Sequence, residues 1–282
     1  MEIRNLVEEQ FGEKILEIRS VSGGDINEAY RVVMPDTVCF LKINNAEKFP
    51  EMFQREAEGL EALRKNSAFR IPEILGFGKF RDTQFLFLEW IEQKVSAAGF
   101  WENFGSNIAR MHQVTQTNFG WNTNNYMGSL VQENTDTEDF SEFFQHRISP
   151  LAKILLDKRD FSVKEIFALE TLYKKLNEIF PEEPPAFIHG DLWSGNFMTD
   201  ESGNPVLIDP AVSFCHREFD LGMTKLFGGF SEQMYRAYAE IYPPEKNWEK
   251  RLPLSQLYPL MIHAVLFGGV YIRRCREIIS EF

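Results

Sequence analysis

The stretch FIHGDLWSGNFM, from Phe187 to Met198, sets a histidine, an aspartate, a tryptophan and an asparagine between apolar residues. A plain surface turn readily uses glycine and asparagine, but it has no evident use for a tryptophan beside an aspartate. Asp191 and Asn196 are spaced as D-x-x-x-x-N, and Asp209 follows eighteen residues after Asp191, at the end of the apolar run PVLID. The pattern predicts a loop that carries chemistry, followed by a hairpin.

This spacing matches an arrangement that serves phosphoryl transfer from ATP. There, one aspartate orients the attacking hydroxyl, while an asparagine of the same loop and a second aspartate after a hairpin hold Mg²⁺. Hard oxygen ligands suit Mg²⁺, and the transfer depends on positioning and electrostatic stabilisation. We therefore expect Asp191 to be catalytic and Asn196 and Asp209 to bind Mg²⁺. Taken singly, each has an ordinary alternative as a turn or helix-capping residue.

A charged residue inside the apolar run CFLKI gives an independent indication. Lys42 needs a partner there, because a buried ammonium without a counter-ion is costly. Glu56, in the helical stretch that follows, is the expected counter-ion, and the lysine would then hold the α- and β-phosphates of ATP. The alternatives are a lysine that protects an edge strand and a glutamate on a solvated helix face.

Two further segments are expected to bind ATP. Gly23 and Gly24 form a turn in SVSGGDINEAYRV, where backbone N–H groups can approach phosphates. A plain hairpin turn is the alternative, because the segment is neither a Walker A loop nor a GxGxxG loop. The strand FLFLEWI ends at a predicted hinge, where the backbone would pair with adenine through Glu89, Trp90 and Ile91. A core strand leading into a helix is the alternative for that segment.

Changes in periodicity predict an α+β fold of two lobes. An amphipathic helix opens the chain, and strands are predicted in AYRVVM, VCFLKI, FRIPEILGFGKF and TQFLFLEWI, with a helix at 47–66 between the second and third. Helical spacing dominates beyond residue 93, interrupted by a strand in FIHGD and a hairpin in NFMTDESGNPVLID. We expect residues 1–92 to form a nucleotide-binding lobe with a small antiparallel sheet, and residues 93–282 to form a mostly helical catalytic and substrate-binding lobe.

Composition argues against several other classes of protein. The 282 residues contain 30 Lys and Arg against 42 Asp and Glu, a formal charge of −12 that repels nucleic acid and anionic membranes. The longest apolar run, LYPLMIHAVLFGGVYI, is too short to span a membrane and predicts a buried helix. The acidic start is not expected to be a signal peptide, and three separated cysteines indicate neither a disulfide framework nor a zinc site. We expect a cytoplasmic protein with no nucleic-acid or membrane partner.

The segments HGDLWSGN, LIDPAVSFCHREFDLGMTKLFGGF, FLKIN and REAEGLEALR together resemble the fructosamine kinase, or ketosamine-3-kinase, family. This family is related to the aminoglycoside phosphotransferases and choline kinases and has a protein-kinase-like fold. The resemblance implies ATP- and Mg²⁺-dependent phosphorylation of the 3-hydroxyl of a ketosamine, a sugar joined to an amine by Amadori rearrangement. The phosphorylated adduct decomposes, so the implied role is repair of glycated proteins or metabolites.

The resemblance also suggests a substrate side of the site. The indole of Trp193 would form an apolar wall for the sugar or for the alkyl chain of the amine, with burial under the loop as the alternative. His216, Glu218 and Asp220 would face an amine-bearing acceptor or cap the next helix, and capping is the ordinary alternative for Asp220 especially. His189 is expected to brace the catalytic loop. Three other histidines are expected to be structural: His112, His146 and His263.

Other functions remain as alternatives. A kinase of the same fold for an aminoglycoside, choline or homoserine is one, although HGDLWSGN argues against it. A nucleotide-binding scaffold without turnover is another, and it has no need of Lys42 together with Asp191, Asn196 and Asp209. A hydrolase with Asp191 and Asp209 as paired carboxylates leaves Lys42 and Asn196 unexplained. We expect a small-molecule ketosamine or a glycated lysine as the substrate, and we favour a monomer.

Overall fold

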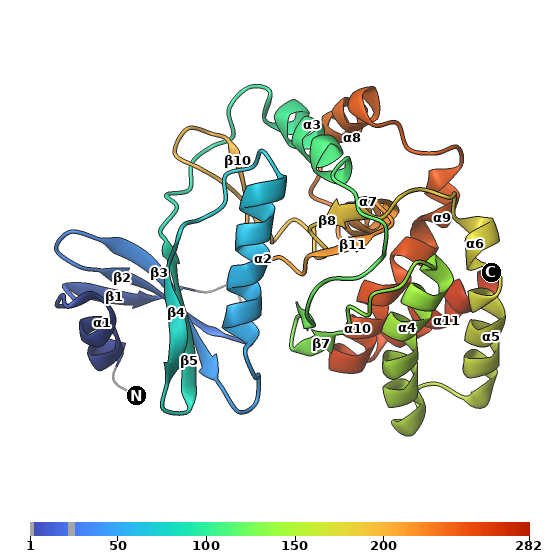
Figure 1. Cartoon of the computed structure of the whole chain (residues 1–282), viewed down its shortest axis with the longest axis horizontal. Coiled ribbons are helices and arrows are strands. Elements are labelled where there is room, and N and C mark those ends of the chain that lie inside the picture. The colour runs from blue at the N-terminus through green and yellow to red at the C-terminus, as the bar shows by residue number, and fades with distance from the viewer. Residues whose placement is uncertain (1–2, 22–25) are drawn as a thin grey trace.

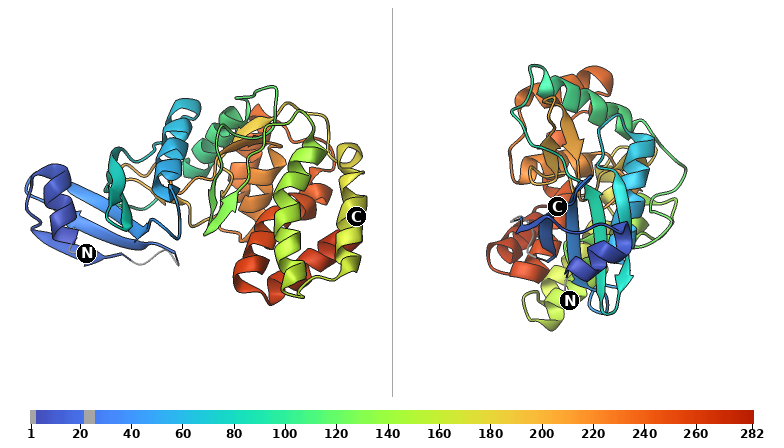
Figure 2. Two further views of the ribbon diagram at one scale, coloured as in Figure 1. Left: turned by 60° about the horizontal axis from the view of Figure 1, so that its bottom comes forward. Right: turned by 90° about the vertical axis from the view of Figure 1, so that its left-hand side faces the viewer.

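A computed structural model describes residues 3–21 and 26–282, and it has a sheet-rich part followed by a helical part (Figures 1 and 2). The first part is a five-stranded antiparallel sheet in the order β1-β2-β3-β5-β4. Its elements are α1 (Ile3–Phe11), β1 (Glu17–Ser20), β2 (Glu28–Val33), β3 (Val38–Asn45), α2 (Met52–Asn66), β4 (Ile74–Phe80) and β5 (Thr83–Glu89).

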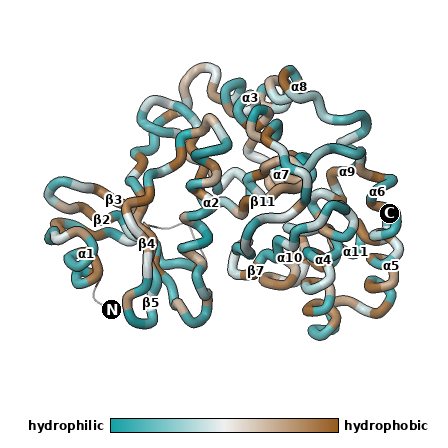
Figure 3. The backbone as a smooth tube through the Cα atoms, viewed as in Figure 1, coloured by the Kyte–Doolittle hydropathy of each residue, from teal (hydrophilic) through white to brown (hydrophobic). Residues whose placement is uncertain are grey.

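Both faces of this sheet are buried, because its central strands are apolar at odd and even positions. Phe85 and Phe87 of β5 pack in a core with α1, whereas Leu86 and Leu88 point to the other face and pack in a core with α2. Figure 3 shows the chain coloured by hydropathy, with hydrophobic stretches in both the sheet-rich and the helical part. Lys42 of β3 lies opposite Leu86 in the ladder, so the two-residue period of the strand directs its side chain toward α2.

The second part is mostly helical. Three two-stranded antiparallel sheets, β6–β7, β8–β11 and β9–β10, lie among its helices. The elements are α3 (Phe100–His112), β6 (Asn125–Met127), β7 (Leu130–Gln132), α4 (Phe140–Asp157), α5 (Val163–Tyr173), α6 (Leu176–Ile179), β8 (Ala186–Ile188), β9 (Phe197–Thr199), β10 (Pro205–Leu207), β11 (Ser213–Cys215), α7 (Glu218–Leu226), α8 (Glu232–Ile241), α9 (Trp248–Ser255), α10 (Leu257–Phe267) and α11 (Val270–Glu281).

Helix α2 belongs to the first part by sequence but shares its core with the second. Phe53 and Leu60 of α2 are buried in one cluster with Phe104 of α3. Gly59 allows α2 to approach the chain just beyond β10, because a Cβ atom at that position would lie 3.1 Å from Cγ of Pro210. The helix is therefore held beside the segment that contains the second predicted metal ligand.

The predicted α+β organisation is confirmed, and so are the hairpins β2–β3 and β9–β10. The β6–β7 hairpin and the pairing of β8 with β11 were not predicted. Strands of three residues, such as β6 and β7, are too short for a visible alternation of apolar residues.

The apolar run 257–272 forms two helices rather than the single buried helix predicted for it. Helix α10 ends before Gly268 and Gly269, which both have positive φ, and α11 begins at Val270. Glycine adopts this conformation without strain. Within the parts of the chain that the structure describes, no helix has the length and apolar character needed to cross a membrane.

Candidate active site

Lys42 joins three separate elements. Its Nζ atom lies 2.7 Å from Oε1 of Glu56 on α2, and it also forms an ion pair with Oδ1 of Asp209, in the segment after β10. The side chain of Lys42 is buried, and burial alone would lower the pKa of the ammonium group. The two carboxylates outweigh this effect and raise the pKa of Lys42, so the ammonium stays charged.

Asp209 has an unusual backbone. Its φ is 53°, in the left-handed region that residues other than glycine rarely adopt. This turn ends the β9–β10 hairpin and presents the carboxylate to Lys42. Burial acts to raise the pKa of Asp209, but the neighbouring ammonium of Lys42 more than compensates and lowers the pKa. The carboxylate is therefore ionised and available to a cation.

Asp191 and Asn196 form the second half of the site. Nδ2 of Asn196 donates to Oδ2 of Asp191 at 2.9 Å and to the backbone oxygen of Asp191 at 2.8 Å. Burial raises the pKa of Asp191 to about 7, while the hydrogen bond from Asn196 acts in the opposite direction. A carboxylate that titrates near neutral pH suits a general base. Oδ1 of Asn196 has no hydrogen-bond partner among residues 3–21 and 26–282, so it remains free for a ligand.

The side chain of Asp220 holds the backbone of the loop that contains Asp191. This buried carboxylate accepts hydrogen bonds from the backbone N–H groups of His189, at 2.8 Å, and Gly190, at 2.9 Å. Its second contact is with Nε2 of His112, at 3.2 Å. Gly190 is required for close packing, since a Cβ atom there would lie 2.1 Å from the backbone oxygen of Ala211. Asp220, which the sequence suggested as a helix cap, thus fixes the loop.

His189 links the two halves of the site. Its Nε2 atom lies 2.9 Å from the backbone oxygen of Ile208, and its Nδ1 atom accepts from the backbone N–H of Asp191 at 3.2 Å. These partners require a neutral ring protonated at Nε2. Burial lowers the pKa of His189, in agreement with a neutral ring. The imidazole therefore braces the loop, as predicted.

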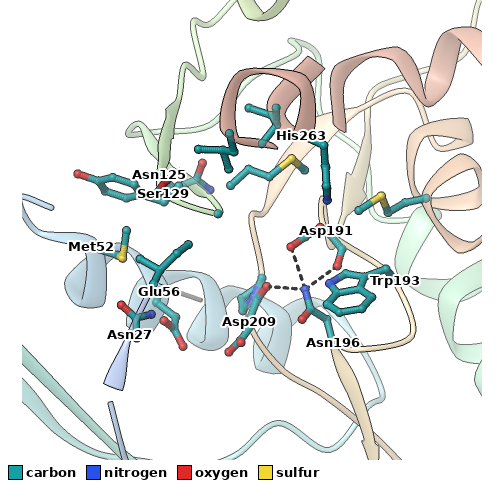
Figure 4. Close-up of a pocket in the computed structure, with 18 of the residues that line it drawn as sticks. Asn27, Met52, Glu56, Asn125, Ser129, Asp191, Trp193, Asn196, Asp209 and His263 are labelled. Atoms are coloured by element: carbon teal, nitrogen blue, oxygen red, sulfur yellow. Dashed lines mark hydrogen bonds between the residues drawn. The ribbon is translucent and has the colours of Figure 1, made fainter. Parts of the chain in front are cut away.

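A cavity of about 960 Å³ brings these groups to one surface (Figure 4). Its floor carries the charged and amide groups named above, and its far walls come from the β6–β7 hairpin and from α10 and α11. The lining includes Lys42, Glu56, Asp191, Asn196, Asp209, Trp193, Met127, Ser129, Met223, Phe227, Ile262, His263, Leu266, Phe267 and Tyr271. The arrangement can hold a polyphosphate and a cation at the floor and a partly apolar acceptor above it.

Trp193 lines this cavity and is not buried under the loop. Its side chain remains 38% exposed, and its ring centre lies 6.0 Å from that of Phe227. The indole lies against Gly195, where a Cβ atom would approach within 2.3 Å of the ring. The glycine of the WSG sequence thus sets the position of the indole.

The structure does not bring His216 and Glu218 to the cavity. His216 is buried, packs edge-on against Phe180 with ring centres 5.0 Å apart, and has its pKa lowered to about 4 by burial. Glu218 is buried and accepts from Nε of Arg251 at 2.9 Å. The expectation that both residues face an acceptor is therefore corrected: their polar atoms point into the core of the helical part.

Of the two further segments predicted to bind ATP, only the one that contains Glu89, Trp90 and Ile91 is described by the structure. Gly23 and Gly24 fall outside the described residues. Glu89 is the last residue of β5 and is followed by Trp90 and Ile91, and none of the three is among the described residues that line the cavity. The carboxylate of Glu89 accepts from Nη2 of Arg70 at 2.5 Å, and the ring of Trp90 lies 6.4 Å from that of Phe40. Any contact of this segment with adenine would therefore use its backbone.

Two contributions to the cavity were missed in the sequence. The β6–β7 hairpin gave no signal, because its strands are too short. His263 was expected to be structural, yet it lines the cavity. The sequence did carry a signal for His263, because it is the one histidine in an otherwise apolar helix.

The chain is similar to known proteins along its whole length. The family model described as fructosamine kinase matches residues 1–282. A probable ketoamine kinase of Enterococcus faecium is 37% identical over 267 residues, which cover 93% of this chain and 94% of the relative. The chloroplastic protein-ribulosamine 3-kinase of Oryza sativa subsp. japonica is 32% identical over 276 residues, covering 95% of this chain and 79% of the relative.

Two solved structures are similar to this chain over almost its whole length. A crystal structure of a candidate fructosamine-3-kinase from Thermobifida fusca has a TM-score of 0.87 and 30% identity, covering 99% of this chain and 97% of the other. An aminoglycoside phosphotransferase in ternary complex with AMP-PNP and hygromycin B has a TM-score of 0.68 and 15% identity, covering 99% and 98%. The second similarity shows the fold alone, and it confirms the predicted protein-kinase-like architecture.

Proposed function

The chain belongs to the fructosamine kinase family, and we propose that it phosphorylates the 3-hydroxyl of ketosamines with ATP and Mg²⁺. It is a phosphotransferase with an alcohol group as acceptor. The observation that carries the proposal is the convergence of Lys42, Glu56 and Asp209 on the cavity that also contains Asp191.

Residues 1–92 are proposed to bind the nucleotide. The ammonium of Lys42, held by Glu56, neutralises charge on the α- and β-phosphates. Glu89 lies opposite Cys39 in the β3–β5 ladder, three residues before Lys42. That separation corresponds to about 10 Å along a strand, which suits a nucleotide with its base at the backbone of 89–91 and its phosphates at Lys42. Gly23 and Gly24 are proposed to cover the phosphates.

Asn196 and Asp209 are proposed to bind Mg²⁺. The fit rests on Oδ1 of Asn196, which has no hydrogen-bond partner among the described residues, and on the ionised carboxylate of Asp209, since both are hard oxygen donors. When bound, the ion would neutralise charge on the phosphate oxygens during transfer. The two residues come from either side of the β9–β10 hairpin, so the hairpin sets their separation.

Residues 93–282 are proposed to supply the catalytic and acceptor-binding groups. Asp191 orients the acceptor hydroxyl and takes its proton as the phosphoryl group arrives. Its position is fixed from below by Asp220 and from the side by Asn196. Trp193 forms an apolar wall for the sugar or the alkyl chain of the amine. His216 and Glu218 are left out of the proposed site, because they are buried away from it.

The proposed substrate is a ribulosamine or fructosamine, as a small molecule or on a glycated lysine. The names of the relatives, ketoamine kinase and protein-ribulosamine 3-kinase, support this class of acceptor. Removal of sugar adducts from amines in the cytoplasm is the proposed role. The partly exposed Trp193 at the cavity supports an acceptor whose amine end extends toward solvent.

The proposal is tested by ADP release. The purified protein is incubated with ATP, Mg²⁺ and either ribulosyl-lysine or fructosyl-lysine, and the product is examined by ³¹P NMR for a 3-phosphate. Choline, homoserine and an aminoglycoside serve as competing acceptors. Turnover with one of these and with no ketosamine would reject the proposed acceptor class, and ATP binding without any turnover would indicate a scaffold.

A further inference from the structure

His263 stands in the acceptor half of the cavity. It comes from α10, and its imidazole points toward Asp191 across the cavity (Figure 4). Its neighbours on α10 that also line the cavity, Ile262 and Leu266, are apolar. A polar group in this setting is costly unless it forms hydrogen bonds.

The protonation of the ring follows from its one protein partner. Nδ1 of His263 lies 2.8 Å from the backbone oxygen of Pro259, one turn earlier on α10. A carbonyl oxygen only accepts, so Nδ1 carries the proton. In the neutral ring, Nε2 is then a hydrogen-bond acceptor. No hydrogen bond joins Nε2 to any residue of 3–21 or 26–282.

Aromatic neighbours hold the ring in this orientation. The ring centres of Phe227, Phe267 and Tyr271 lie 5.2, 5.6 and 5.0 Å from that of His263. An imidazole packed among three rings and tied at Nδ1 has little freedom to turn its Nε2 away from the cavity. Nε2 of His263 is therefore preorganised as a hydrogen-bond acceptor.

Among the other lining groups, the hydroxyls of Ser129 and Tyr271 can also accept a hydrogen bond, whereas several neighbours offer no free acceptor. Met127 and Met223 are apolar. Oδ1 of Asn125 already accepts from Gln132 and Asn134, while Nδ2 donates to the backbone oxygen of Val212. A sugar hydroxyl enclosed here without an acceptor would lose the hydrogen bond that it makes in water.

We infer that Nε2 of His263 accepts a hydrogen bond from a second hydroxyl of the sugar, while Asp191 accepts from the hydroxyl that is phosphorylated. His263 is then a specificity-determining residue that selects polyhydroxylated acceptors. This inference rests on the proposed function and deepens it, because two acceptors on opposite sides of the cavity require two hydroxyls on one substrate.

The tautomer is tested first, without any turnover. In ¹⁵N NMR spectra of labelled protein, the ring of His263 should show a protonated Nδ1 and an unprotonated Nε2. Saturation with ribulosyl-lysine and a non-hydrolysable ATP analogue should shift the Nε2 signal and leave Nδ1 bound to Pro259. A ring protonated at Nε2, or an Nε2 signal that does not respond to saturation, would overturn the inference.

Kinetics with two variants then separate recognition from packing. His263→Phe keeps an aromatic ring but removes the acceptor, and we expect kcat/KM for the ketosamine to fall by about 10- to 100-fold, mainly through KM, with KM for ATP unchanged. His263→Gln places a side-chain oxygen near the position of Nε2 and should recover most of the loss. His146→Gln, on α4 and not among the residues that line the cavity, is the matched control and should behave as wild type. Equal losses in both His263 variants, with lowered Tm, would assign the residue to packing and overturn the inference.

Substrate analogues identify the hydroxyl. Ketosamines that lack one hydroxyl at a time are compared in wild type and His263→Phe. For one analogue, the wild-type kcat/KM should drop to the value of the variant, and the variant should show no further loss. If wild type phosphorylates ketosamines and His263→Phe matches it on all of them, the inference fails and the proposed function stands. If wild type phosphorylates no ketosamine, the proposed function fails and the inference falls with it.

Discussion

Nζ of Lys42 lies 2.7 Å from Oε1 of Glu56, although the two residues come from different elements, β3 and α2. The same ammonium contacts Asp209, which lies 167 residues later in the chain. One buried charge therefore connects the sheet, the helix that packs across both parts, and the loop after β10. A change at Lys42 should affect the position of all three.

Substitution of Lys42 by methionine should reduce kcat sharply, because no cation would then meet the phosphates. The loss of one preorganised charge at a reacting phosphate corresponds to about 100- to 1000-fold. The measurement is kcat and KM for ATP at saturating acceptor, with Tm as a check on folding. Lys65→Met, on the exposed end of α2, is the matched control, and a Lys42→Met protein with wild-type kcat would show that the phosphates are held elsewhere.

The pH dependence of activity should report the ionisation of Asp191, the proposed general base. Burial raises the pKa of Asp191 to about 7, and the carboxylate must be ionised to take a proton. The value of kcat/KM for the acceptor should therefore rise with pH through about 7 and level off above it. The measurement is initial rates between pH 5.5 and 9 at saturating ATP and Mg²⁺. A flat profile across this range would assign the proton transfer to another group.

The same carboxylate should affect stability with the opposite sign. The pKa of Asp191 is higher in the folded protein than in the unfolded chain, so ionisation is disfavoured by folding. Its stabilising contribution is complete below the unfolded value of about 3.9 and is lost as pH rises to about 7. Asp191→Asn should thus become more stable relative to wild type between these two values, although its kcat falls by several orders of magnitude.

Denaturant unfolding at pH 5, 6, 7 and 8 measures this difference in free energy. Asp157→Asn, at the exposed end of α4, controls for the change of side chain and should show no such trend. A difference between Asp191→Asn and wild type that stays constant across the four pH values would contradict the raised pKa.

Asp220→Asn should disturb the backbone of the loop that carries Asp191, although Asp220 itself does not line the cavity. The carboxylate uses one oxygen for the N–H of His189 and the other for the N–H of Gly190. An amide has only one oxygen, so one N–H would face an NH₂ group and stay unsatisfied, at a cost of about 1–3 kcal/mol. We expect a lowered Tm and a lowered kcat, with KM for ATP changed little. Wild-type kcat and Tm together would show that the loop is held by other contacts.

The grouping of residues at the floor of the cavity was predictable from sequence because its signals are local. The spacing of Asp191, Asn196 and Asp209 follows from one loop and one hairpin, and Lys42 is conspicuous as a charge inside an apolar strand. The prediction that His216 and Glu218 face the acceptor was wrong, because proximity in sequence to Asp209 does not decide which way a side chain points.

The partners that turn those two side chains into the core come from distant segments. Glu183 precedes β8, and Arg251 lies on α9; neither leaves a mark in the sequence around His216 or Glu218. The wall of the cavity formed by the β6–β7 hairpin was missed for a related reason. The β6–β7 hairpin takes its place through tertiary contacts such as the one between Asn125 and the backbone of Val212, which no local pattern shows.

Gly195→Ala should act on the acceptor and not on the nucleotide. A Cβ atom at this position would lie 2.3 Å from the ring of Trp193, so the indole has to move away from the loop. Asn196, the next residue, is held by its hydrogen bonds to Asp191 and should stay in place. We expect KM for the ketosamine to rise several-fold, with KM for ATP unchanged and a shifted tryptophan fluorescence.

Two further variants decide whether the indole carries that effect. Trp193→Ala should raise the same KM, and adding Gly195→Ala to it should have little additional effect, because the clash has no partner left. Ser194→Ala, in the same loop, controls for general disturbance and should keep the KM for the ketosamine near the wild-type value. Additive effects of the Trp193 and Gly195 changes would mean that Gly195 acts on the loop that carries Asn196, since the displaced ring could then not account for the loss.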